Sequence, residues 1–224
     1  MDLSVLVEAR NEYIDQLTNL MAPRVILVLD KLYSEANTLS KGKKVLLKFQ
    51  ALLKEVPNWN EKMTDDHTRE ITDSCAWFND LMAAAFVSYV KILSSIRLNN
   101  NGQKVSIKLP TNKIFVQSVY NAMAEDIYND PYIFTEVISD REKNNALTER
   151  LKGCIDRVIK SLAPIQDILK AYMSVPNDTS TVEVDVNDQD FEDTEDPDVN
   201  DEPENPTEPD ETPMDAPPME NEGP

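Results

Sequence analysis

Residues 77–96 read WFNDLMAAAFVSYVKILSSI, and apolar side chains would cover nearly every face of a helix with this sequence. Its uncharged core, Leu81–Val90, is about half as long as a bilayer-spanning helix must be, so no membrane span is predicted. A helix of this kind is typical of the centre of a helical bundle. We therefore expect its large side chains to be core residues, among them Trp77, Phe86 and Val90.

Apolar residues at spacings of three and four continue on both sides of this run and predict an all-α fold, a multi-helix bundle with a long central helix. The central helix is expected from about residue 64 to residue 98. Pro23 should kink or restart the first helix, and Pro164 should interrupt the last. Other helices are predicted at 2–37, 45–56, 111–128 and 139–173.

Local signals mark where these helices end. Ser139 and Glu142 have the spacing of a capping box at the start of the last helix. Val105–Leu109 alternates apolar and polar residues and predicts one short strand or an extended arm. Breaks are expected at 40–44, 57–60, 99–102 and 130–131.

The net charge of −19 lies entirely in the last quarter of the chain. Residues 176–224 contain 19 of the 41 Asp and Glu residues, nine prolines and no Lys or Arg, whereas residues 1–175 balance 22 acids against 22 bases. Such a segment cannot bury enough apolar surface to offset the entropy of ordering it. The sequence predicts an α-helical domain at 1–175 followed by a disordered, acidic, Pro-rich tail at 176–224.

This charge distribution bears on the partners. Proteins bind duplex DNA largely by placing Lys and Arg against phosphates, and a neutral domain with an acidic tail offers few such contacts. We therefore expect no direct binding to nucleic acid, and protein partners instead, among them proteins with basic surfaces. The N-terminus has no basic segment followed by an apolar one, so no secretory signal is predicted.

Residues with catalytic or metal-binding chemistry are few, and no catalytic, cofactor-binding or metal site is predicted. His67 is the only histidine and lies in the acidic stretch Asp65–Thr68, where a solvated side chain is expected. Cys75 and Cys154 are in no metal-binding or disulfide pattern and are expected to be buried thiols. The adjacent acids 65–66 and 125–126 are expected to be solvated, because neighbours on a helix point to different faces.

Two further features allow more than one interpretation. Lys41, Lys43, Lys44 and Lys48 form the basic cluster of the chain, which could be a solvated helix start, a nucleic-acid patch, or a place where the tail folds back. Trp59, in the turn Pro57–Asn60, could fix that turn to the core or face a partner as a hot spot.

Six short motifs, in conserved order along residues 48–134, resemble an uncharacterised protein family of large nucleocytoplasmic DNA viruses. The motifs are Phe49-Gln50, Val56–Asn60, Cys75–Leu81, Ala85–Ser88, Lys91–Arg97 and Tyr128–Phe134. The resemblance implies a virus-encoded protein, a virion or assembly component, located in the virion or in the cytoplasm of the infected host cell. It implies no activity and no catalytic residue.

Three functional hypotheses follow. The first is a non-enzymatic structural or assembly protein that acts through protein–protein contacts. The second is a chaperone or nucleic-acid mimic whose acidic tail binds a basic viral protein. The third is an enzyme with scattered catalytic residues, which the sequence disfavours.

Overall fold

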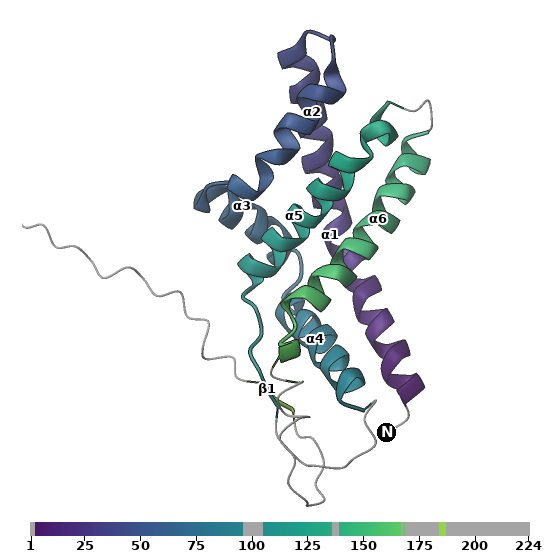
Figure 1. The fold of residues 1–224 in the computed structure, drawn as a ribbon, viewed down its shortest axis with the longest axis vertical. Coiled ribbons are helices and arrows are strands. Elements are labelled where there is room, and N and C mark those ends of the chain that lie inside the picture. The colour runs from purple at the N-terminus through teal and green to yellow at the C-terminus, as the bar shows by residue number, and fades with distance from the viewer. Residues whose placement is uncertain (1–2, 96–104, 136–138, 167, 169–183, 187–224) are drawn as a thin grey trace, which may run out of the picture. The chain divides into compact units, whose positions relative to one another are not determined.

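The computed structural model describes residues 3–95, 105–135, 139–166, 168 and 184–186 (Figure 1). Its helices confirm the predicted all-α fold, a multi-helix bundle. The elements are α1 (Leu3–Ser40), α2 (Val45–Lys54), the 3-10 helix η1 (Val56–Asn58), α3 (Glu61–Thr72), α4 (Phe78–Ser95), β1 (Val105–Ile107), α5 (Asn112–Asn129), the 3-10 helix η2 (Pro131–Phe134), α6 (Asp140–Leu162) and β2 (Val184–Val186).

The longest helix, α1, runs through the bundle and packs against α2, α3, α4 and α6 (Figure 1). Three ion pairs fix α6 antiparallel to it: Asp30 with Lys143, Asp15 with Lys152, and Arg10 with Asp156. As the residue numbers on α6 rise, those on α1 fall. The C-terminal end of α6 therefore lies beside the N-terminal part of α1.

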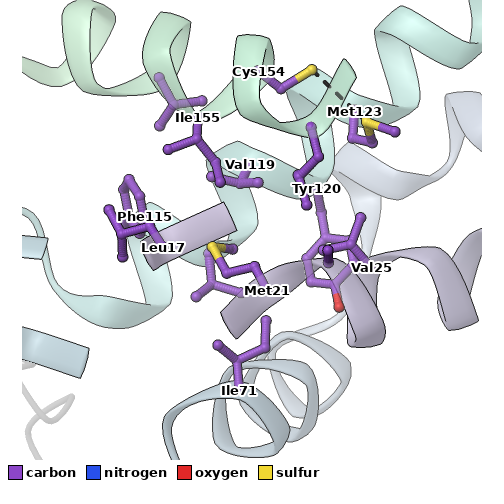
Figure 2. Packing of buried hydrophobic residues seen from close by; sticks show 14 of the residues in the cluster. Leu17, Met21, Val25, Ile71, Phe115, Val119, Tyr120, Met123, Cys154 and Ile155 are labelled. Atoms are coloured by element: carbon purple, nitrogen blue, oxygen red, sulfur yellow. Dashed lines mark hydrogen bonds between the residues drawn. The ribbon is translucent and has the colours of Figure 1, made fainter. Parts of the chain in front are cut away.

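The core is built from buried side chains of all six α-helices, and Figure 2 shows the part where α1, α3, α5 and α6 meet. The apolar spacing of α1 and α5 makes this possible, because each helix turns one stripe of its surface inward. Figure 2 shows these side chains converging from the four helices: Leu17, Met21 and Val25 of α1, Ile71 of α3, Phe115, Val119 and Met123 of α5, and Ile155 of α6.

Predicted helix ends are confirmed where a side chain caps the backbone. The Ser139 hydroxyl accepts a hydrogen bond from the Glu142 amide while the Glu142 carboxylate accepts one from the Ser139 amide, which is the predicted capping box. Thr111 caps α5 and Asn60 caps α3. In each case the side-chain oxygen accepts a hydrogen bond from the backbone amide three residues later. These polar side chains satisfy amides that a helix start leaves without an intrahelical partner.

Pro23 does not restart the first helix, because α1 is continuous from Leu3 to Ser40. Pro23 and Asn19, whose carbonyl loses its helical hydrogen bond, both lie on the exposed face of α1. Water can reach that carbonyl, while Met21, Ala22 and Val25 remain buried on the opposite face. The free-energy cost of Pro23 within the helix is thereby reduced, and packing of the buried face keeps α1 continuous.

The expected long central helix is two helices, α3 and α4, separated by residues 73–77. Ser74 donates its hydroxyl hydrogen to the Ile71 carbonyl, which competes with the helical ladder, and Asp73 and Ser74 are both poor helix formers. Trp77 therefore lies in the connection and is half exposed, so the prediction that it is a core residue was wrong. Phe86 and Val90, on α4, are fully buried as predicted.

The last helix is interrupted at Pro164, as predicted: α6 ends at Leu162, and residues 165–166 and 168 are again helical. α6 stops at Leu162 because Pro164 disfavours helical geometry at the residue before it, and Ala163 is extended. Leu147, Leu151, Cys154 and Val158 of the predicted apolar stripe are buried, whereas Ile165 is largely exposed. Residues 169–173, which were expected to continue the helix, lie outside the described residues.

The short strand β1 confirms the strand alternative for Val105–Leu109. Its partner is β2, which pairs with it in parallel through Val105 and Val184, Ser106 and Asp185, and Ile107 and Val186. The three residues of β2 lie inside the predicted tail. Valines alternate with acidic residues there, a pattern that favours an extended strand. The rest of residues 176–224 lies outside the described residues, so the boundary at 175 and the disorder of the tail stay predictions.

Candidate protein-docking groove

The two cysteines are buried free thiols, as the sequence predicts. Cys154 lies in the core, where its sulfur is 3.9 Å from the Met123 sulfur and accepts a hydrogen bond from the Arg157 guanidinium (Figure 2). Burial raises the pKa of the Cys154 thiol. Because the thiolate is the nucleophilic form, this environment makes Cys154 a packing residue.

His67 is not the solvated side chain that its acidic surroundings predict. Its ring packs against two aromatic rings, with its centre 4.8 Å from that of Trp59 and 5.3 Å from that of Tyr120; the Trp59 and Tyr120 rings are themselves 5.3 Å apart. Neither His67 Nδ1 nor the Tyr120 hydroxyl has a hydrogen-bond partner among the described residues. Burial lowers the pKa of His67 and raises that of Tyr120, so both rings are held neutral.

This aromatic cluster, Trp59, His67 and Tyr120, confirms that Trp59 fixes its turn to the core. It connects η1, α3 and α5, three elements that are adjacent in space. The cluster contributes to packing, since His67 and Tyr120, the two side chains that could exchange protons, pack against each other and against Trp59. It also creates a dependence of stability on pH.

We expect the free energy of unfolding to fall as the pH is lowered from 7.5 to 5.5. His67 has a lowered pKa in the folded protein, so the unfolded chain binds a proton more readily. The stabilisation that neutral His67 provides is complete above the pKa of histidine in the unfolded chain, about 6.5, and is lost as the pH falls below that value. Urea denaturation at three pH values checks this. His67→Gln should flatten the dependence; equal slopes in the two proteins would contradict it.

A groove of about 600 Å³ opens on the surface between α2, η1, α5 and α6. α5 contributes one face at spacings of three and four, with small or polar side chains that leave the space unfilled. The lining residues are Leu53, Lys54, Pro57, Ser118, Asn121, Ala122, Ala124, Glu125, Tyr128, Arg157, Val158 and Ser161.

Two cations and one carboxylate border the groove. The Lys54 ammonium lies 4.9 Å from the centre of the Tyr128 ring, in a cation–π contact. The Arg157 guanidinium is more than half exposed, donates to the Cys154 sulfur and lies 3.8 Å from the Asp126 carboxylate. Glu125 is exposed and forms no ion pair with the described residues, so the two cations Lys54 and Arg157 give the lining a small excess of positive charge.

The position of Asp126 explains why Arg157 is held in place. Arg150 donates from Nε to Asp126 Oδ2 at 2.5 Å and from Nη2 to the Asp126 carbonyl at 2.9 Å. Asp126 is therefore engaged with two arginines of α6, Arg150 and Arg157, and the expectation of a merely solvated carboxylate was wrong. Asp65 also has a partner, because its carboxylate lies 3.0 Å from the Lys113 ammonium.

The lining of the groove combines apolar and polar side chains. Leu53, Pro57 and Val158 give it an apolar floor, and Ser118 and Asn121 offer hydrogen bonds along one wall. This combination of apolar surface with a few convergent polar groups is typical of binding sites. Within the residues that the structure describes, no three His, Cys, Asp or Glu side chains are grouped to hold a metal ion.

Sequence patterns could not locate this groove. The alternation of small and polar residues on α5, from Ser118 to Glu125, is visible in the sequence and marks a face without large side chains. The wall from α6 becomes apparent only when the two helices are placed side by side. The four-lysine cluster, in contrast, lies where predicted, at the turn between α1 and α2.

Comparisons with known proteins give a family and no function. Searches of curated proteins and of solved structures found no match. In the part of the chain that the structure describes, no helix combines the length and the apolar character that a membrane crossing requires. Residues 3–135, more than half of the chain, match a family described as a family of unknown function (DUF5764), and the chain belongs to that family.

Proposed function

We propose that this chain is a non-enzymatic structural or assembly protein of a large nucleocytoplasmic DNA virus, and that it acts by docking on other proteins. The viral context is supported by the six motifs between residues 48 and 134, which fall within the matched family region. The virion and the cytoplasm of the infected cell are the proposed locations. The docking role is supported by the groove.

The observation that carries the proposal is the open groove between α2, η1, α5 and α6. Its floor suits an apolar side chain, and Lys54 and Arg157 suit an acidic one next to it. Asn121 keeps its amide hydrogens free for a ligand, since its Oδ1 already accepts from Gln117 Nε2 at 2.8 Å. The groove therefore fits a short amphipathic segment with an acidic residue, presented by a partner protein.

Site-specific photo-crosslinking tests the groove in infected cells. A photoreactive residue replaces Asn121 in the groove, and in a second protein it replaces Glu8, an exposed residue of α1. We expect one prominent crosslinked protein from position 121, and we expect that this protein is not crosslinked from position 8. The same protein crosslinked equally from both positions would contradict docking in the groove.

A second function, a chaperone or nucleic-acid mimic, is favoured by the tail itself. Residues 187–224 contain 16 acids and no base, and a polyanion of this kind binds basic proteins. The two functions differ in their response to salt, because exposed charge pairs are screened over about 8–10 Å at 0.1–0.15 M salt. Docking in the groove should survive both high salt and removal of 187–224.

We expect deletion of residues 187–224 to leave the helicity and melting temperature of the remaining protein nearly unchanged. This deletion keeps β2 and removes most of the acidic residues. Circular dichroism with thermal melting measures both quantities. Loss of helicity, or a drop in melting temperature of about 4 °C or more, corresponding to roughly 1 kcal/mol, would show that the tail supports the fold.

A further inference from the structure

We propose that the turn between α1 and α2 is a membrane-contacting tip that binds the surface of anionic lipid bilayers. The tip comprises residues 39–48, a protruding helix–turn–helix (Figure 1). The proposal is independent of the groove, since none of these residues lines it. It rests on the charge of the tip and on its exposed apolar side chains.

The backbone of the turn is closed by hydrogen bonds and projects its side chains outward. The amides of Lys41, Gly42 and Lys43 donate to the carbonyls of Thr38, Asn37 and Ser40 at 3.0–3.2 Å. Lys41, Gly42 and Lys44 all have positive φ, between 52° and 74°, which is a left-handed conformation that lysine rarely adopts. The result is a sharp turn in which all the lysines are exposed.

The tip concentrates positive charge in a domain, residues 1–175, whose acids and bases balance overall. Residues 36–54 contain five lysines and no acid. No carboxylate of the described residues forms an ion pair with the four lysines of the tip: Lys41, Lys43, Lys44 and Lys48. Two acids on neighbouring elements are engaged elsewhere: Asp130 pairs with Arg150, and Glu142 is in the capping box. Four ammonium groups are thus available to a ligand.

Large apolar side chains are exposed next to these charges. Leu39 and Leu47 flank the lysines and are 54% and 62% exposed. Tyr132, 62% exposed, lies on η2, which packs against α2 through the rings of Phe49 and Phe134, 4.9 Å apart. Leucines that insert among acyl chains, with lysines at the headgroups, are typical of proteins that lie on a membrane surface.

The leucines favour a lipid surface over a purely ionic partner. The phosphates of a nucleic acid, or the acidic tail of the chain, would neutralise the lysines and leave both leucines in water. Anionic lipid headgroups with the acyl chains below them match both kinds of side chain.

Vesicle co-sedimentation of the full-length protein tests the proposal. The vesicles are phosphatidylcholine alone, or phosphatidylcholine with about one third phosphatidylserine, at 0.1 M salt. We expect binding to the anionic vesicles only, weakened at 0.5 M salt. Each lysine near the surface should contribute roughly fivefold in affinity, so Lys43→Gln/Lys48→Gln should reduce binding about 25-fold.

The matched control is Lys31→Gln/Lys62→Gln, which removes the same charge from exposed positions outside the tip and should change binding less than twofold. Leu39→Ser/Leu47→Ser should also reduce binding while leaving the circular dichroism spectrum unchanged. Failure of the full-length protein to bind anionic vesicles, or equal losses in the two lysine variants, would overturn the proposal. So would lysine-dependent binding of a peptide of residues 187–224, or of duplex DNA, without vesicle binding.

Discussion

Phe86→Ala should lower the free energy of unfolding by about 3–5 kcal/mol, the range for a buried phenylalanine replaced by alanine. Phe86 is fully buried on α4, and its ring meets that of Phe115 edge to face, with centres 6.0 Å apart. The substitution leaves a cavity between α4 and α5 and removes this aromatic contact. Urea denaturation followed by circular dichroism measures the change.

Trp77→Ala is the matched control for this variant. Trp77 is a larger aromatic residue next to the same helix, but half of it is exposed. We expect it to cost about 1 kcal/mol, in the range of a partly exposed side chain. A loss below about 1 kcal/mol for Phe86→Ala would show that its face of α4 is not in the core. Equal losses for the two variants would contradict the break between α3 and α4.

Asp156→Ala should lower the free energy of unfolding by about 2–3 kcal/mol. Asp156 pairs with Arg10, which is 12% exposed, lies 5.2 Å from the centre of the Tyr89 ring and has no partner for its Nε among the described residues. Removal of the carboxylate leaves a nearly buried guanidinium unpaired. The cost is less than the roughly 3–5 kcal/mol of a fully buried pair because Asp156 is in contact with water.

Lys160→Ala controls for the other partner of Asp156. Its ammonium lies 2.5 Å from Asp156 Oδ2 but is about half exposed, so its removal should cost less than about 1 kcal/mol. Burial of Asp156 works against its charged form, yet hydrogen bonds from Lys160 and Arg10 outweigh it and hold the pKa of Asp156 below its ordinary value. If Lys160→Ala costs as much as Asp156→Ala, the ion pair between α1 and α6 is not the source of the stability.

Features that depend on a few neighbouring residues could be predicted from the sequence. The capping box at Ser139, the break at residues 40–44 and the buried thiols of Cys75 and Cys154 follow from local chemistry, and all are confirmed. Phe86 and Val90 were correctly placed in the core because α4 is apolar on most of its faces.

Features that depend on distant parts of the chain could not be predicted. His67 was expected in solvent because its sequence neighbours are acidic, but Trp59 and Tyr120, from other elements, enclose it. Pro23 interrupts a hydrogen bond without ending α1, because packing on the opposite face outweighs the loss. The groove depends on small residues of α5 meeting α6, which no spacing within one helix indicates.

The most direct measurement of the docking proposal is the yield of the crosslink from position 121 when the groove is filled. Ala122→Phe places a large ring in the groove, and Ala51→Phe makes the same change at an exposed position of α2 outside it. We predict that Ala122→Phe abolishes the crosslinked partner at 0.1 and 0.5 M salt, while Ala51→Phe retains it at both. A partner captured equally by both variants and lost at 0.5 M salt would contradict docking in the groove and would assign binding to the acidic tail.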